Sequence, residues 1–221
     1  MPDFSMQARA HVARPLVAAF VAGAALVSGC AQTAVYNPTL ISHPRTPASD
    51  KLVGKILILT DKQDDDVPWE GPPTSFTGSG TKLSIPVGQI TREVAVTVLG
   101  EMFVDGAAKA NTIADAGDYR LIVKPRVEKY SYEYNQLKNA GFAVTPTAVV
   151  TLEVSVVGSD GQIRSSWIYN SGPVEMPAYI ISGSPGEDIA RATHKAIYEL
   201  MVRAAREVRR EALLQQYPTR L

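Results

Sequence analysis

The feature that most constrains this chain is an uncharged run of twelve residues just before its single cysteine. The run, LVAAFVAGAALV, covers residues 16–27, and the only cysteine of the 221-residue chain is at position 30. Arg9 and Arg14 precede the run. Twelve residues are too few for a membrane-spanning helix, which needs about 20 apolar residues. A basic start, a short apolar centre and small residues at its end are typical of a secretory signal peptide, so we expect residues 1–29 to take no part in the fold.

The end of this segment resembles the lipobox of bacterial lipoproteins. Val27, Ser28, Gly29 and Cys30 follow its aliphatic, small, small, cysteine pattern, with valine where leucine is usual. The resemblance implies cleavage between Gly29 and Cys30, a diacylglycerol on the Cys30 thiol, and acylation of the new amino group by a fatty acid such as palmitate. Several acyl chains anchor a protein stably, because each buried methylene contributes about 0.8 kcal/mol. The alternatives are a signal peptide without lipid and a thiol buried by chance.

Lipidation of Cys30 would leave the mature chain without a thiol. No disulfide could then form in an oxidising compartment, and catalytic-cysteine, zinc-thiolate and iron–sulfur sites are excluded. The residue after Cys30 is Ala31 and not an aspartate. In this respect the chain resembles those lipoproteins of Gram-negative bacteria that are sorted by default to the outer membrane. For a Gram-negative source, the predicted location is the periplasmic face of the outer membrane. The covalent lipid is the membrane anchor, and no cofactor is predicted besides it.

The remaining 192 residues are enough for one domain with a sizeable core. Residues 30–51 contain three prolines and no helical or alternating pattern, so they are predicted to form a lipidated flexible tether. Residues 52–216 are predicted to form a single α/β domain, and residues 217–221 a C-terminal tail. The mature chain has 20 basic and 21 acidic residues. This balance gives no electrostatic reason to expect nucleic acid as a partner.

The first half of the domain contains two clear patterns. VGKILILT, residues 53–60, is typical of a strand buried on both faces. Residues 88–103 repeat apolar side chains four apart, which predicts an amphipathic helix. Residues 61–82 are predicted to be a long loop, and residues 105–118 a connector of small residues.

The strand that starts at Tyr119 changes phase along its length. Its apolar side chains lie first on odd and then on even positions: Leu121, Val123 and Val127, then Tyr130, Tyr132 and Tyr134. A shift of one residue is what a β-bulge produces. Pro125 indicates an edge strand, or the place where the irregularity begins. The tyrosines could form an interaction stripe or cover one face of the sheet.

The next two strands are predicted with their register. Residues 148–156 alternate between apolar and polar side chains, and Asp160 and Gly161 suit a two-residue type I′ hairpin turn. This turn sets Val154 opposite Trp167 and Leu152 opposite Tyr169, so the large apolar side chains share one face.

The last element is a long helix. Ser184 is predicted as its N-cap, Pro185 as its first residue, and Glu187 as the third, which completes a capping box. Four arginines follow towards its end: Arg203, Arg206, Arg209 and Arg210. They could contact phospholipid headgroups or an acidic partner, or they could form a solvated helix end.

Other candidate site residues lack the spacing of a known motif. Asp64, Asp65 and Asp66 lack the spacing and the glycine of an EF-hand, and residues 78–82, GSGTK, do not fit a phosphate-binding loop. An acidic turn and a flexible turn are expected instead. Trp69 either folds onto the core or is presented to a partner. His43 is expected in a solvated loop and His194 at the surface or rim, so no metal site is predicted.

The element order predicts an α+β two-layer sandwich. Strand, helix, three antiparallel strands and helix give a mostly antiparallel sheet with two helices on one face. With a lipidated N-terminus, this order resembles periplasm-facing lipoproteins of lipopolysaccharide export, of curli secretion and of lipid-transport machines. The resemblance rests on element order, so it carries over no functional residue.

Two functional classes are open. The favoured one is a non-enzymatic component or adaptor of an outer-membrane assembly or transport complex, with an envelope protein or a second copy as partner. Its candidate contact residues are Trp69, Tyr130, Tyr132, Tyr134, Arg206, Arg209 and Arg210. The other is a periplasmic binder of a small ligand or lipid, or an enzyme whose carboxylates meet only in the fold. The mature sequence offers no recognisable nucleophile-and-base motif, so no enzyme is predicted.

Overall fold

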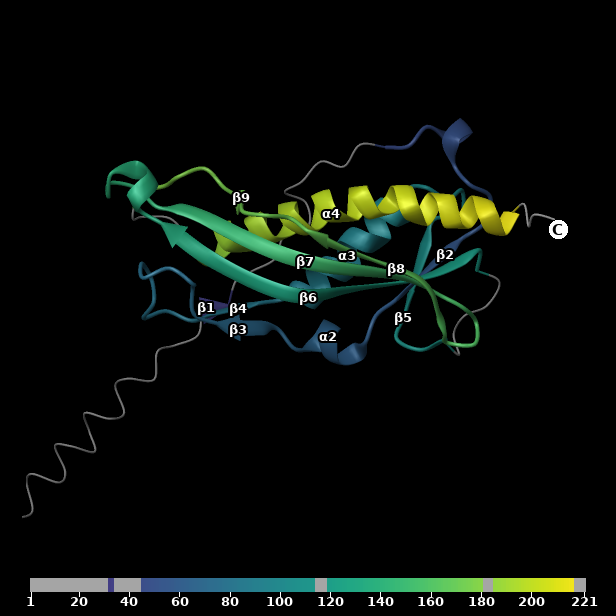
Figure 1. Cartoon of the computed structure of the whole chain (residues 1–221), viewed down its shortest axis with the longest axis horizontal. Helices are drawn as coiled ribbons and strands as arrows, with labels where there is room; N and C mark the ends of the chain where they lie inside the picture. Colours follow the sequence, from purple (N-terminus) through teal and green to yellow (C-terminus); the bar gives the residue numbers. More distant parts are fainter. Residues whose placement is uncertain (1–31, 34–44, 114–118, 181–184, 217–221) are drawn as a thin grey trace, which may run out of the picture. The chain divides into compact units, whose positions relative to one another are not determined.

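The structure is a computed structural model that describes residues 32–33, 45–113, 119–180 and 185–216 (Figure 1). All of them belong to one compact unit, Ala31–Leu221. Residues 27–30, His43 and Ser184 lie outside the described residues, so the lipobox and the helix cap stay predictions. In chain order the elements are β1 (Gln32–Thr33), η3 (Ala48–Asp50), β2 (Ile56–Leu59), α2 (Lys62–Asp66), β3 (Trp69–Gly71), β4 (Leu83–Ile85), α3 (Val87–Gly100), β5 (Ala107–Ala110), β6 (Leu121–Asn135), η5 (Leu137–Asn139), β7 (Thr145–Val157), β8 (Ile163–Asn170), β9 (Val174–Glu175) and α4 (Pro185–Gln216).

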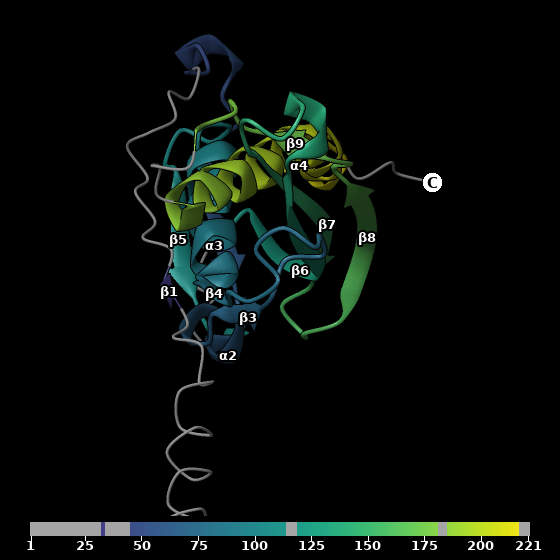
Figure 2. The same cartoon turned by 90° about the vertical axis from the view of Figure 1, so that its left-hand side faces the viewer.

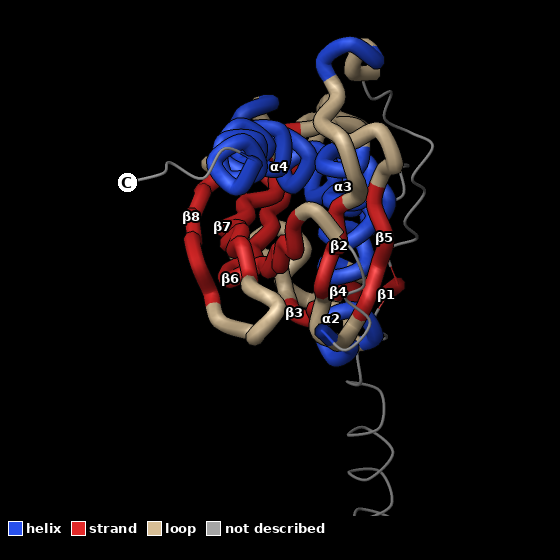
Figure 3. The backbone as a smooth tube through the Cα atoms, turned by 90° about the vertical axis from the view of Figure 1, so that its right-hand side faces the viewer, coloured by secondary structure: helices blue, strands red, loops and turns tan. Residues whose placement is uncertain are grey.

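A six-stranded sheet and two helices form the two layers of this unit. The strand order is β5-β2-β6-β7-β8, and β9 also pairs with β7. β2 runs parallel to β5 and β6, whereas the pairings of β7 with β6, β8 and β9 are antiparallel. α3 and α4 pack on the same face of the sheet (Figure 3). The predicted α+β sandwich is confirmed, and the parallel part of the sheet at β5 is an addition to it.

Alternate side chains of β2 belong to two different apolar clusters. Ile56 and Ile58 lie in the main core, which the sheet shares with α3 and α4. Leu57 and Leu59 lie in a smaller cluster with Ile122, on the other face of the sheet. All four side chains are buried, so the predicted strand is buried on both faces. Each such side chain contributes about 1.5–3 kcal/mol to the free energy of unfolding.

β6 contains the predicted change of phase. Its pairing with β7 shifts between Val127 and Lys129, so Glu128 is the extra residue of a β-bulge. The bulge returns the later tyrosines to the face that carries Leu121 and Val123. β2 pairs with β6 only as far as Val123. Pro125 therefore stands where β6 has lost its neighbour on one side, which agrees with the edge position that proline requires.

β7 and β8 pair in the predicted register, with Val154 opposite Trp167 and Leu152 opposite Tyr169. The predicted type I′ turn is wrong, because Gly161 has a φ of 82° but Asp160 does not have a positive φ. The Gly161 amide donates to the Gly158 carbonyl at 2.9 Å, and the Gly158 amide donates to the Gln162 carbonyl at 2.8 Å. This is the longer hairpin loop, a type I turn closed by a glycine. A register shift between Val156 and Val157 absorbs the added residue.

Segments predicted to lack regular structure contain short elements. The 61–82 loop includes α2 and β3, and β3 pairs antiparallel with β4. The 105–118 connector begins with β5. Within the segment predicted as a tether, β1 pairs in parallel with β4. Elements of two to five residues are too short for a hydrophobic period to reveal them.

α4 is one helix of 32 residues whose apolar stripe faces the core. Glu187 in its first turn pairs with Arg191, with Oε1 and Nη2 2.5 Å apart. The expectation of a surface His194 is wrong, because this side chain is only 2% exposed. Thr193 beside it is fully buried. The buried stripe of α4 is therefore wider than a spacing of four residues indicates.

Candidate functional site

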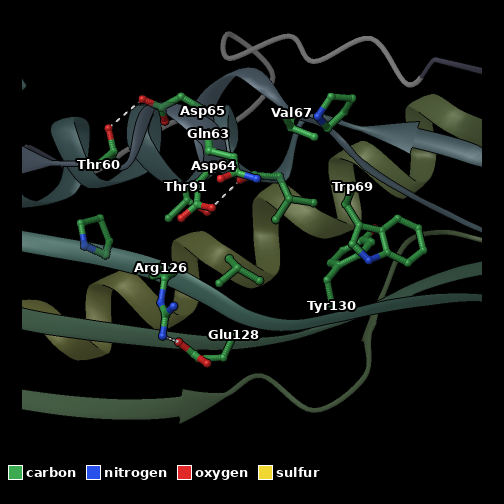
Figure 4. A pocket seen from close by; sticks show the side chains of 15 residues that line it. Thr60, Gln63, Asp64, Asp65, Val67, Trp69, Thr91, Arg126, Glu128 and Tyr130 are labelled. Atoms are coloured by element: carbon green, nitrogen blue, oxygen red, sulfur yellow. Dashed lines mark hydrogen bonds and ion pairs between the residues drawn. The ribbon is translucent and has the colours of Figure 1, made fainter. Parts of the chain in front are cut away.

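A cavity of about 300 Å³ lies between α2, β3 and β6, with the first turns of α3 in its lining (Figure 4). Val67, Trp69, Val127 and Tyr130 give it an apolar wall. Its polar residues are Thr60, Gln63, Asp64, Asp65, Thr91, Arg126 and Glu128. Figure 4 shows Trp69 and Tyr130 side by side, away from the Arg126–Glu128 pair. Such a volume is at the lower end of the range for small-molecule pockets.

The apolar wall is part of an aromatic cluster. The Trp69 ring centroid is 4.8 Å from that of Tyr130 and 5.7 Å from that of Tyr132, both edge to face. Tyr132 is in turn 5.7 Å from Tyr134. The Tyr132 hydroxyl donates to the Gly71 carbonyl at 3.0 Å, which fixes β3 to β6. Burial raises the pKa of Tyr130 and Tyr134 well above the usual value, so both hydroxyls stay protonated.

This cluster decides between the two roles considered for the tyrosines. Tyr132 and Tyr134 are 1% and 5% exposed, and the hydroxyl of half-buried Tyr130 lies 2.8 Å from Thr193 Oγ1 of α4. They cover one face of the sheet. The partner contact predicted for Tyr132 and Tyr134 is therefore corrected, because their side chains offer no surface. Trp69 is half-buried and folds onto the core, and its contact with the cavity keeps a binding role open.

Asp65 holds α2 against the neighbouring elements. Its Oδ2 accepts hydrogen bonds from Thr60 Oγ1 at 2.7 Å, Arg92 Nη1 at 2.6 Å and Asn111 Nδ2 at 3.1 Å. Its side chain is only 2% exposed. The expected acidic turn is corrected, because the three aspartates lie in a helix, α2, and only Asp64 and Asp66 are exposed. Among the residues that the structure describes, no group of three or more His, Cys, Asp or Glu could hold a metal ion.

The charged groups at the polar end of the cavity compensate one another. Arg126 pairs with Glu128, and its Nη2 is 3.3 Å from Glu153 Oε2 on the next strand. Glu153 Oε1 also accepts a hydrogen bond from Ser166 Oγ at 2.7 Å. The Ser166 hydrogen bond, with a contribution from Arg126, holds the pKa of Glu153 below its usual value. Glu153 is therefore ionised at neutral pH.

The arrangement suits binding better than catalysis. Trp69 and Tyr130 offer flat apolar surfaces against which a ring or an acyl segment could pack. The carboxylates of Asp65 and Glu128 are already engaged by arginines. A general base needs a carboxylate that can reach a reacting group, and the two exposed carboxylates of the lining are Asp64 and the arginine-paired Glu128.

The arginines near the end of α4 divide into two groups. Arg209 Nη2 donates to the Asp50 carbonyl at 2.8 Å and so joins α4 to η3. Arg206 and Arg210 are exposed, and Arg210 pairs with Glu207 at 2.5 Å. Partner contact stays a prediction for these two. In the described part of the chain, no helix is long and apolar enough to cross a membrane.

Four large apolar side chains are exposed in the loops at one end of the unit, which we call the apolar end. Figure 2 views the unit from this end. Phe76 lies in the β3–β4 loop, Leu137 and Phe142 in the β6–β7 turn, and Ile180 after β9. They are 94%, 93%, 80% and 73% exposed. Sequence reasoning missed them because single apolar residues in loops have no period. The available signal was their position among turn-forming residues such as Gly78 and Gly141.

Comparisons with known proteins give structural similarities at low identity. No protein-family model and no curated protein sequence matches the chain. A Helicobacter pylori homologue of a neuraminyllactose-binding hemagglutinin is 11% identical with a TM-score of 0.42, covering 80% of this chain and 95% of its own. The PelC dodecamer from Paraburkholderia phytofirmans is 12% identical with a TM-score of 0.34, covering 73% and 92%. A protein from Caulobacter crescentus described as a lipoprotein has the same identity and TM-score, covering 62% and 88%. At these TM-scores the similarities carry no argument about function.

Proposed function

We propose that this chain is a lipoprotein of the cell envelope, anchored through Cys30 at the periplasmic face of the outer membrane. There it acts as a non-enzymatic component of an assembly or transport complex. The observation that carries the proposal is the only cysteine of the chain, placed behind a signal-like segment in a lipobox pattern.

Surface features of the unit support a role in an assembly. β8 is the last strand of the sheet order, so its outer edge carries backbone groups that a further strand could pair with. Ile163 and Ile168 are exposed on this strand. Arg206 adds an exposed basic side chain on α4, next to the exposed Arg210, which pairs with Glu207. An envelope protein or a second copy of this chain is the proposed partner.

A Cys30→Ser variant tests the anchor. The wild-type protein is expected to incorporate labelled palmitate and to fractionate with the outer membrane, because only a thiol can accept the diacylglycerol. Cys30→Ser should incorporate no label and stay at precursor size. Ser28→Ala keeps a small residue at that position and is the matched control, with labelling retained. Palmitate incorporation and processing that survive Cys30→Ser would overturn the anchor.

The cavity beside Trp69 favours a second candidate, a binder of a small ligand or lipid. Photocrosslinking in intact cells separates the two candidates. A crosslinking residue at Ile168 or Arg206 should capture one defined envelope protein or a second copy, and the same residue at exposed Lys62 of α2 should not. Recovery of the protein alone, with a small molecule bound by native mass spectrometry, would replace the adaptor by the binder.

A further inference from the structure

The apolar end lies beside the strand that follows the proposed lipid anchor. β1 pairs in parallel with β4, with Gln32 opposite Leu83. β1, β4 and β3 form a small sheet of their own, and β1 and β4 start at the same end of it. The loop that carries Phe76 leads into β4 at this end. Only one residue stands between Gln32 and Cys30. A chain spans at most about 3.6 Å per residue, so the Cα atoms of Gln32 and Cys30 are within about 7 Å of each other in any conformation.

The loops that form the apolar end support one another. Thr77 Oγ1 donates to Gln136 Oε1 at 3.2 Å, and Ser75 Oγ accepts a hydrogen bond from the Tyr134 amide at 2.9 Å. These bonds hold the β3–β4 loop against the base of the β6–β7 turn. Val144 and Tyr179 exchange two backbone hydrogen bonds of 2.9 and 3.0 Å, which bring Ile180 to the other side of that turn. The four apolar side chains therefore project from interconnected segments.

The apolar end carries little net charge. Lys138 Nζ is 2.5 Å from Glu175 Oε2, so these two charges compensate each other. The 72–82 loop has a single charged residue, Lys82, and is otherwise rich in Ser, Thr and Gly. Apolar side chains among hydroxyl and amide groups suit the interfacial region of a bilayer, where apolar tips are buried and polar groups stay hydrated. Exposed apolar patches of this kind mark interaction sites.

We propose that the apolar end rests on the bilayer that holds the Cys30 lipid, with Phe76, Leu137 and Phe142 inserted at the level of the headgroups. This rests on the lipid anchor of the proposed function. A lipid on a short chain fixes one point but leaves the domain free to rotate about it. The apolar end supplies further contacts and sets the orientation. The opposite end of the unit, with the β7–β8 turn, then faces the periplasm (Figure 1).

Site-specific fluorescence on the acylated protein tests this orientation. Lipidation leaves no thiol, so single cysteines at Phe76 or Phe142 can carry an environment-sensitive dye. The protein is purified in detergent and reconstituted into vesicles of phosphatidylethanolamine and phosphatidylglycerol. Both dyes should shift to shorter emission wavelengths and be quenched by brominated acyl chains. A dye at Ile163→Cys, on an exposed apolar side chain of β8, is the matched control and should stay in water.

A second variant separates insertion from closeness to the anchor. A dye at Ser79→Cys, in the same loop as Phe76, should lose about two thirds or more of its quenching by lipid when Phe76, Leu137 and Phe142 are all changed to serine, because apolar burial drives the contact. These side chains are exposed, so the fold is expected to be unchanged by circular dichroism. Unchanged quenching in the triple variant would overturn the insertion.

The remaining outcomes each decide one of the two proposals. Acylation is measured separately, by mass spectrometry of the purified protein. An acylated protein whose Phe76 and Phe142 dyes stay in water overturns the orientation and leaves the anchor standing. A blue shift without quenching by brominated lipid, together with crosslinks to a protein at Phe76, assigns the apolar end to a protein partner and also overturns it. An unacylated protein overturns the proposed function and the orientation with it.

Discussion

Glu153 shows at the scale of a single residue how charge is held on the outer face of the sheet. It accepts hydrogen bonds from Ser166 and Arg126, which lie on the strands to either side. These interactions favour the ionised form and lower the pKa of Glu153. A carboxylate with a lower pKa in the folded state stabilises the fold above its unfolded-state pKa. That contribution disappears as the pH falls through the folded-state pKa.

Glu153→Gln is therefore expected to lower the free energy of unfolding at neutral pH, by about 1 kcal/mol or less because the pair is partly exposed. The deficit should shrink as the pH falls below the usual glutamate pKa of 4.5. Urea unfolding at a series of pH values measures it. Ser166→Ala is the companion variant and should move the acid loss of stability to higher pH, since it removes the largest cause of the shift. A deficit that stays constant down to about pH 3 would contradict this account.

Residues that obey a period were predictable, and residues governed by tertiary contacts were not. The change of parity from Val127 to Tyr130 indicated a bulge, because a strand repeats every two residues. The burial of His194 depends on which elements cover α4, and no local pattern states this. The same holds for Asp65, whose partners Arg92 and Asn111 are 27 and 46 residues away in the sequence.

At the scale of elements, the contact between α2 and α3 shapes the cavity. Gly88 lies in the first turn of α3, and a Cβ atom there would overlap the Asp64 carbonyl oxygen of α2. The glycine lets the two backbones approach closely. α2 can then lie over the cavity, with Asp65 bound to Thr60 and Arg92.

Gly88→Ala is expected to displace α2 and to lower the free energy of unfolding by about 1–3 kcal/mol, because backbone atoms cannot yield as flexible side chains do. Gly80→Ala is the matched control. Nothing lies within 4 Å of its added Cβ, so its effect should stay within about 0.5 kcal/mol. Urea unfolding of both variants measures the difference. Equal stabilities of the two variants would show that α2 moves aside without cost.

Length decided which elements could be predicted. The helix at 88–103 and the strand at 148–156 extend over enough residues to show a period, and both occur near the predicted bounds. β3, β4 and β5 have three or four residues each and escaped detection. The cavity is built from α2 and β3, so it could not be predicted although Trp69 was noticed. The predicted register of the β7–β8 hairpin is correct although the predicted turn type is wrong, because the apolar faces of the two strands define the register.

At the scale of the whole unit, one core joins the two layers. The main cluster contains buried residues of β2, β4, α3, β6, β7 and α4. Trp69 on β3 and Trp167 on β8 pack against this same cluster from different strands. Elements that share one core unfold together in most small domains.

We therefore expect residues 31–221 to unfold in a single transition. Trp69→Phe and Trp167→Phe leave one tryptophan each, so fluorescence then reports the surroundings of the other. In each variant the fluorescence midpoint in urea should coincide with the midpoint from far-ultraviolet circular dichroism. An earlier fluorescence transition in Trp167→Phe, where Trp69 is the probe, would mean that β3 detaches before the core unfolds.

The extra residue at Glu128 also determines what a small genetic change would do to this surface. Glu128 has no partner on β7, because Val127 lies opposite Leu152 and Lys129 lies opposite Thr151. Loss of the Glu128 codon would therefore join these two pairs into a continuous ladder and leave the tyrosines beyond on their present face. Loss of a codon from a strand without a bulge would instead turn every later side chain to the other face, so the bulge lets this strand shorten by one residue while its aromatic row stays inside.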